Sequence, residues 1–144
     1  MNPTLWYEEG YKYRTVLDYV LQTRVKPAKF ILTDFIRLDT DGVMSIKAGY
    51  AWDGPSGPTF DTVDAMIGSL ANDAFYQLMR EGMLSVDEYR KPADRELWRL
   101  CVEDGMLEAR ADVWYVGVRG FARGAAETPT EVLSAPVAGI PLPA

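Results

Sequence analysis

The stretch "KFILTDFIRLDTDGVMSIK" (residues 29–47) decides the first half of the fold. It holds two apolar runs separated by "DTDG" (residues 39–42), whose Asp-Gly pair is typical of a tight turn between antiparallel strands. The residues after the turn alternate between apolar and polar. The strand formers before it are Phe30, Ile31, Phe35, Ile36 and Leu38. The pattern predicts a β-hairpin.

The residues before this hairpin extend the strand pattern. Tyr11, Tyr13 and Thr15 alternate with Lys12 and Arg14, which predicts a strand. The segment "LDYVLQTRV" (residues 17–25) is compatible with a strand or a helix, and we favour a strand. The N-terminal half is therefore expected to form a small antiparallel sheet.

The residues after the hairpin change from strand to helix periodicity. The loop "WDGPSGPTFDT" (residues 52–62) contains two Pro and two Gly and should turn tightly between the sheet and the helices. An apolar stripe with helical spacing then predicts a first helix over residues 62–80, which Gly82 ends. The stripe is Val63, Met66, Ile67, Leu70, Ala74 and Leu78.

Two further helices are expected after Gly82. "SVDE" (residues 85–88) reads as a capping box, and Pro92 suits the first turn of a second helix that Gly105 closes. Cys101 falls on the apolar face of this helix, together with Leu97 and Leu100, and is expected in the core. A third helix is expected from residue 106 to about residue 123.

These elements predict an α+β fold. We expect one domain over residues 1–126, in which a small antiparallel sheet packs on about three helices, followed by an extended Pro-rich tail over residues 127–144. The tail has four Pro and no Lys or Arg, so it cannot form a core alone. Its apolar side chains are interface candidates: Val132, Leu133, Val137, Ile140 and Leu142.

Composition removes several classes of function. The chain has 144 residues, a net charge of −6 and a pI of about 4.6, which argues against a general nucleic-acid binder. It has no apolar run long enough to span a membrane, and one cysteine, which rules out an internal disulfide. It has no histidine, which removes Ser-His-Asp and Cys-His catalysis and histidine-bound zinc.

The loop before the first helix is one candidate site. This loop contains Asp53, Ser56 and Asp61, and it could present backbone carbonyls to a cation or the Ser56 hydroxyl to a substrate. The alternative, which we favour, is a structural turn in which Asp53 and Ser56 accept hydrogen bonds from backbone N–H groups.

The first two helices carry the other candidates. "NDAFYQLMR" (residues 72–80) places Asn72 and Asp73 inside an apolar run, and Asp73, Tyr76 and Arg80 share one helix face. A structural explanation is an Asp73 paired with Arg80, Arg90 or Arg95. In the second helix, Asp94 either complements the helix dipole near its start or supports the Asp73 face.

These motifs resemble a family of phage and prophage proteins, Domain of Unknown Function 1353. The resemblance rests on "GYAWDGPSGPTFDT", "SLANDAFYQLMR", "RKPADRELW" and "EDGM", and it covers roughly residues 30–120. It implies a phage or prophage source and no firmly assigned activity. Members usually carry His-Asp in the first helix, whereas this chain has Asn72 at the histidine position and keeps Asp73, Tyr76, Arg80 and Asp94.

The same helix is similar, over a short pattern, to the active-site helix of secretory phospholipases A-two. That similarity implies calcium bound by Asp73 and by the loop over residues 52–57, with Asp94 orienting the residue at position 72. The catalytic base would fall on Asn72, and an amide cannot take a proton from water at neutral pH. The similarity therefore implies a catalytically silent version, with calcium as its only implied cofactor.

Three hypotheses about function follow. The favoured one is a non-catalytic bacteriophage protein, a virion or tail structural or assembly component, located in the virion after assembly in the host cytoplasm. Its partners would be other phage structural proteins or further copies of itself. The alternatives are a calcium-dependent hydrolase acting on lipid or cell wall, in which Asp73, Asp94 or Glu96 must replace histidine as the base, and a counter-defence binding protein.

Overall fold

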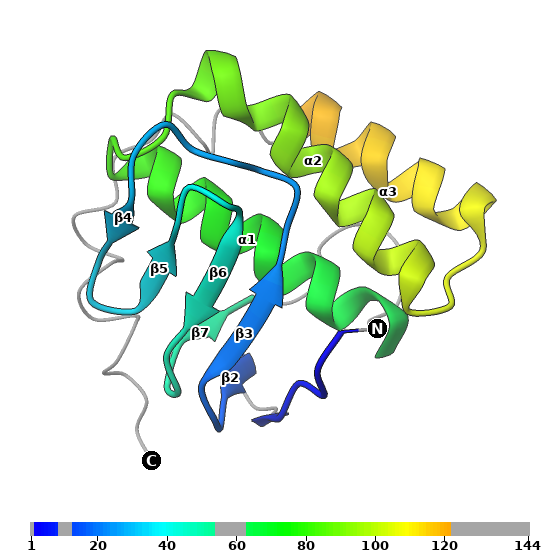
Figure 1. Cartoon of the computed structure of the whole chain (residues 1–144). Coiled ribbons are helices and arrows are strands. Elements are labelled where there is room, and N and C mark those ends of the chain that lie inside the picture. Colours follow the sequence, from blue (N-terminus) through cyan, green and yellow to red (C-terminus); the bar gives the residue numbers. More distant parts are fainter. Residues whose placement is uncertain (1, 9–12, 54–62, 122–144) are drawn as a thin grey trace. The chain divides into compact units, whose positions relative to one another are not determined.

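The structure is a computed structural model that describes residues 2–8, 13–53 and 63–121. The described residues divide into two compact units, one within residues 2–53 and one within residues 63–121, which are described separately below. The first unit holds antiparallel sheets and the second holds three α-helices (Figure 1), which confirms the α+β class. Within the described residues, no helix has the length and the apolar content that crossing a membrane requires.

The first unit contains two antiparallel sheets. The three-stranded sheet has the order β1-β2-β7, with β1 at Tyr7–Glu8, β2 at Tyr13–Thr15 and β7 at Ala51–Trp52. The four-stranded sheet has the order β3-β6-β5-β4, with β3 at Tyr19–Gln22, β4 at Ile31–Leu32, β5 at Ile36–Leu38 and β6 at Val43–Ile46. The strand expected within residues 17–25 is thus β3.

The predicted hairpin is the pair β5–β6, and its turn is held from within. The Asp39 carboxylate accepts hydrogen bonds from the backbone N–H of Asp41 at 2.9 Å and of Val43 at 3.1 Å. Gly42 has a φ of +90°, and a Cβ there would lie 2.5 Å from the carbonyl oxygen of Thr23. Only glycine meets both conditions, so "DTDG" fixes the turn and its close approach to the end of β3.

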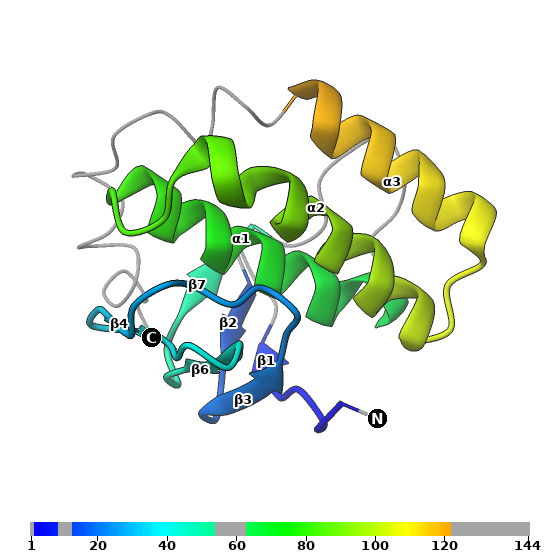
Figure 2. The same ribbon diagram turned by 45° about the horizontal axis from the view of Figure 1, so that its top comes forward.

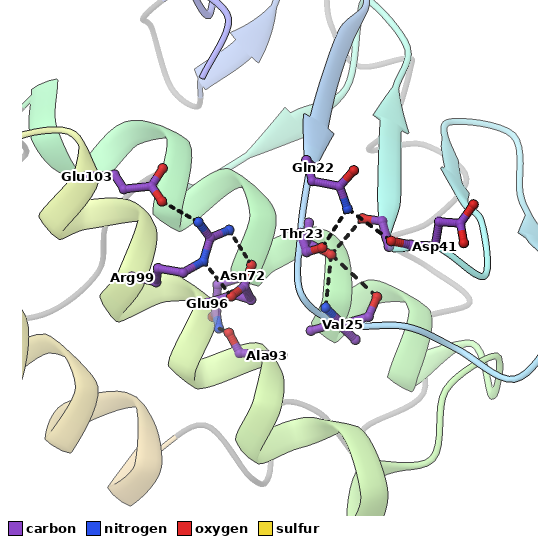
Figure 3. Close-up of polar contacts among 10 residues, drawn as sticks. Gln22, Thr23, Val25, Asp41, Asn72, Ala93, Glu96, Arg99 and Glu103 are labelled. Carbon is purple, nitrogen blue, oxygen red and sulfur yellow. Dashed lines mark hydrogen bonds and ion pairs between the residues drawn. The ribbon is translucent and has the colours of Figure 1, made fainter. Parts of the chain in front are cut away.

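The end of β3 is tied to the same turn (Figure 3). The Thr23 hydroxyl donates to the Gly42 carbonyl at 2.8 Å and accepts from the Val25 N–H at 3.2 Å. The Gln22 amide donates to the carbonyls of Thr23 and Asp41, at 2.9 and 3.0 Å. These hydrogen bonds fix the register of β3 beside β6.

The second unit consists of a 3₁₀ turn and three helices. The turn η1 spans Val63–Ala65, followed by α1 at Met66–Arg80, α2 at Val86–Glu103 and α3 at Glu108–Phe121. Figures 1 and 2 both show α2 lying between α1 and α3. The expected stripe is buried from Met66 onward, but Val63 is 80% exposed because it precedes the first turn of α1.

The prediction for the start of the second helix was wrong. The Ser85 hydroxyl accepts the N–H of Glu88 at 3.3 Å, as the capping box predicts, but α2 begins directly after it at Val86. Pro92 therefore lies inside α2, not in its first turn. A proline inside a helix lacks the N–H bond to the preceding turn, and its ring crowds the carbonyl four residues earlier. Here the cap and the buried face of α2 outweigh that cost.

Both glycines expected to end helices do so. Gly82 and Gly105 have φ values of +77° and +105°. The N–H after each glycine reaches back over the last turn, from Met83 to the Leu78 carbonyl at 2.8 Å and from Met106 to the Cys101 carbonyl at 3.0 Å. This is the Schellman pattern, and it ties Met106 to the end of α2, so the third helix starts at Glu108 and not at residue 106.

The contact between α1 and α2 is close at Gly68. A Cβ on Gly68 would lie 2.8 Å from the sulfur of Cys101 and 3.1 Å from the backbone oxygen of Leu97. Cys101 is fully buried, as predicted, and burial raises the pKa of its thiol to about 12. A core cluster forms around it from Ala65, Leu97, Cys101, Met106, Ala111 and Trp114.

Gly68→Ala is expected to destabilise the protein by about 1–3 kcal/mol, because the added methyl meets a buried sulfur and a backbone oxygen that cannot both move away. The matched control is Gly117→Ala in α3, where a Cβ meets no described atom within 4 Å. Urea unfolding of dilute protein measures both. Adding Cys101→Ala to Gly68→Ala should recover part of the loss, whereas equal effects of Gly68→Ala and Gly117→Ala would contradict the close approach.

Candidate functional site

The candidate residues of the second unit gather around Asp94, a buried carboxylate in the middle of α2. Asp94 is 0% exposed. Its Oδ1 accepts hydrogen bonds from the Tyr76 hydroxyl at 2.7 Å and from the Asn72 amide at 3.2 Å, and its Oδ2 accepts from the Arg119 guanidinium at 2.9 Å. We call Asn72, Tyr76, Asp94 and Arg119 the Asp94 cluster. It joins all three helices.

Helix geometry explains how α1 supplies two of these donors. Asn72 and Tyr76 are four residues apart, so their side chains lie on one face, one turn above the other. The Asn72 amide also reaches the backbone carbonyl of Ala93, next to Asp94, at 3.4 Å (Figure 3). The contact between position 72 and Asp94 is the one that the phospholipase pattern implies. The placement of Asp94 near a helix start was wrong, because α2 begins at Val86.

Two arginines hold the end of α3 against this cluster. Arg119, in the last turn of α3, forms the ion pair with Asp94. Arg90, a buried residue of α2, donates to the carbonyls of Val118 and Arg119 at 3.2 and 2.7 Å. A cation at the last carbonyls of a helix satisfies both their lone pairs and the negative end of the helix dipole. Arg90 therefore has a structural role, because it binds the end of α3 to α2.

The sequence did not predict the role of Arg119. Its only local signal is a basic residue in the last turn of a helix, which is favourable there whatever its partner. The partner is 25 positions away and depends on how α3 packs on α2. A pairing of this kind cannot be found from helical spacing.

The hydroxyl of Tyr76 is held in its protonated form. Burial raises the pKa of Tyr76 above its ordinary value of 10.0, and the hydrogen bond and the negative charge of Asp94 raise it further. A hydrogen bond with Arg90 and the positive charge of Arg90 lower this pKa, and both effects are smaller. Tyr76 is thus a proton donor in a hydrogen bond, and all three groups that face Asp94 are donors.

Glu96 is another carboxylate considered as a base, and its oxygens also accept hydrogen bonds within the protein. Both of its oxygens accept hydrogen bonds from Arg99, at 2.7 and 2.9 Å, and Arg99 also contacts Glu103 (Figure 3). The bond to Glu96 is the main reason that the pKa of Arg99 is raised. Glu96 is buried and takes part in an ion pair on one helix, so its lone pairs are committed to Arg99.

Asp73 and Arg80 lie on α1 beside the cluster. Asp73 is half-buried and follows Asn72, and Arg80 donates to the side-chain oxygen of Gln77 at 2.9 Å. In the part of the chain that the structure describes, no three His, Cys, Asp or Glu side chains come together as metal ligands would. Calcium at Asp73 stays a prediction.

The remaining candidates fall elsewhere. Asp53 is exposed and follows β7 in the first unit. Ser56 and Asp61 lie outside the described residues, as do the interface candidates Val132, Leu133, Val137, Ile140 and Leu142. No protein-family model, curated protein or solved structure matches the chain. The likeness to the phage family therefore rests on the sequence motifs alone.

Tyr76→Phe is expected to cost about 1–2 kcal/mol at neutral pH, because it leaves a buried carboxylate with one donor fewer. The raised pKa of Tyr76 means that the folded state resists ionisation of this hydroxyl while the unfolded state does not. Its contribution to stability is therefore complete below about pH 10 and falls as the pH rises above that value.

The measurement is urea unfolding at about pH 8 and about pH 10.5. Wild type should lose more stability between the two pH values than Tyr76→Phe does. Tyr115→Phe, in α3, is the matched control and should behave as wild type. An equal pH response of wild type and Tyr76→Phe would mean that Tyr76 is not held in this way.

Proposed function

We propose that the chain is a non-catalytic bacteriophage protein, a structural or assembly component of the virion or its tail. The observation that carries this proposal is that both carboxylate oxygens of Asp94 already accept hydrogen bonds within the protein. A catalytic carboxylate must reach a substrate or a water molecule to accept or give a proton. Asp94 has no exposed surface, and both of its oxygens accept hydrogen bonds from side chains that are themselves donors.

The residue at position 72 supports the same conclusion. Asn72 donates its amide protons to Asp94 and to the carbonyl of Ala93. An amide nitrogen used in this way has no basic lone pair, so this side chain cannot activate water. Asn72 therefore serves to hold α2 in place.

The phage and virion parts of the proposal rest on the sequence motifs. The loop at residues 52–59 and the helix at residues 69–80 resemble those of a phage and prophage family. A protein whose Asp94 cluster stabilises its own fold acts through its surface. The described surface includes large apolar side chains that are at least half exposed, among them Val113, Val116 and Leu107 on or beside α3.

Quantitative mass spectrometry of particles purified from the phage or prophage that encodes the chain tests the proposal. We expect a fixed number of copies per particle, in constant ratio to the major capsid and tail proteins. Particles that lack the chain, while infected cells contain it in abundance, would contradict the virion role. Host proteins that adhere to particles serve as the control for contamination.

One observation favours an alternative, a calcium-dependent hydrolase. Asp94 contacts both position 72 and Tyr76, the arrangement in which such an enzyme would hold its base. If this reading is right, wild type should hydrolyse phospholipid vesicles or cell-wall material when calcium is present, and Asp73→Asn should abolish the activity. If wild type is inactive and Asn72→His is active, the chain is a silent relative. Inactivity of both, with the variant folded, would exclude the alternative for those substrates.

A further inference from the structure

The last two turns of α3, residues 115–121, attach to α2 mainly through polar contacts, and we call them the α3 end. The first half of α3 contributes to the core cluster around Cys101. From residue 115 to residue 120, in contrast, no residue is buried. Among these described residues only Val118 packs on the cluster, and it is partly buried. The position of the α3 end therefore depends on the contacts of two arginines.

The sequence of the α3 end, "YVGVRGF", is a poor helix former. Its seven residues include two glycines and two valines and no alanine, leucine or glutamate. One glycine lowers the population of a helix about fivefold relative to alanine, and β-branched residues lower it further. A Cβ at Gly117 or Gly120 would meet no described atom within 4 Å, so close packing does not require these glycines. By itself the α3 end is thus only weakly stable as a helix.

Arg90 and Arg119 offset this weakness. Arg90 donates to the carbonyls of Val118 and Arg119, which belong to the last four of α3 and so lack a partner within the helix. Arg119 pairs with Oδ2 of Asp94 at 2.9 Å. The Asp94 side chain is 0% exposed but that of Arg119 is 32% exposed, so water and salt reach the pair from the outer side.

These contacts can break while the rest of the helical unit stays folded. Asp94 keeps the hydrogen bonds from Asn72 and Tyr76, because both donors come from α1. Water can replace Arg119 at the second carboxylate oxygen. The first half of α3 keeps its apolar contacts with α2. Such a local opening requires less free energy than unfolding the whole unit.

From a poor helix former that two arginines hold in place, we propose that the α3 end is a latch, which opens locally while α1, α2 and the first half of α3 stay folded. When closed, it covers Oδ2 of Asp94 and the guanidinium of Arg90. When open, both groups lack their partners from α3, so a molecule that binds them would hold the latch open. The latch is a property of the fold and does not depend on the proposed virion role.

Native-state hydrogen exchange of the full chain, measured for each amide by NMR, tests whether the latch opens. The amides of residues 118–120 should be at least about 100-fold less protected than that of Leu100, a fully buried residue of α2. Low concentrations of urea should not change their exchange, because a local opening exposes little surface. Equal protection of the two groups would overturn the latch, since residues 118–120 would then exchange only through global unfolding.

A variant tests whether Arg119 sets the opening. Arg119→Met keeps most of the apolar stem but removes the ion pair, and it should speed exchange at residues 118 and 120 about tenfold. The matched control is Arg95→Met, because Arg95 is an exposed residue of α2, and it should leave this exchange unchanged. Equal rates in wild type and Arg119→Met would overturn the proposal.

Two measurements keep the test decisive if Arg119→Met does not fold. Raising the salt concentration from about 0.05 to about 1 M should speed exchange at residues 118 and 120 of wild type, because salt screens the Asp94–Arg119 pair. Gly120→Ala should slow exchange at residue 118 about threefold to fivefold, because alanine favours the helical, closed state. If neither change alters the exchange, the latch is overturned.

Discussion

The burial of one negative charge at Asp94 constrains the whole helical unit. Removing a carboxylate from water costs several kcal/mol, and only well-placed partners offset that cost. Here the partners come from two other helices: Asn72 and Tyr76 from α1, and Arg119 from α3. If either helix shifts along α2 by one turn, the carboxylate loses a donor. The register of α1, α2 and α3 is therefore set by this polar geometry, together with the close approach of Gly68 in α1 to Leu97 and Cys101 in α2.

The parts of the fold that could be predicted from the sequence depend on residues close together in the chain. The turn at Gly42, the cap at Ser85 and the ends at Gly82 and Gly105 each need a few neighbouring residues, and each was predicted. Pro92 shows the limit of local rules. Its preference for a first turn is real, but a stronger start signal lies seven positions earlier and the buried face of α2 continues through it.

The candidate site shows the same division. Helical spacing places Asn72 and Tyr76 on one face, and the motif resemblance points to Asp94, so three members of the cluster could be named from the sequence. Arg119 could not, because several arginines are equally plausible partners until α3 is placed on α2. The role of Arg90 was missed for the same reason, since its acceptors are backbone carbonyls of another helix, which have no signature in the sequence.

The hydrogen bonds around Asp94 stabilise the fold, and by themselves they do not indicate a catalytic role. Asp94 needs a donor at position 72, and either an asparagine amide or a histidine N–H supplies one. The two residues differ in what remains after that bond: histidine keeps a basic nitrogen, while asparagine keeps only a weakly basic carbonyl oxygen. The geometry at Asp94 is thus compatible with losing the base without losing the fold. Selection on such a chain would then act on its surfaces, where α3 is the described helix with an apolar face turned away from its neighbour.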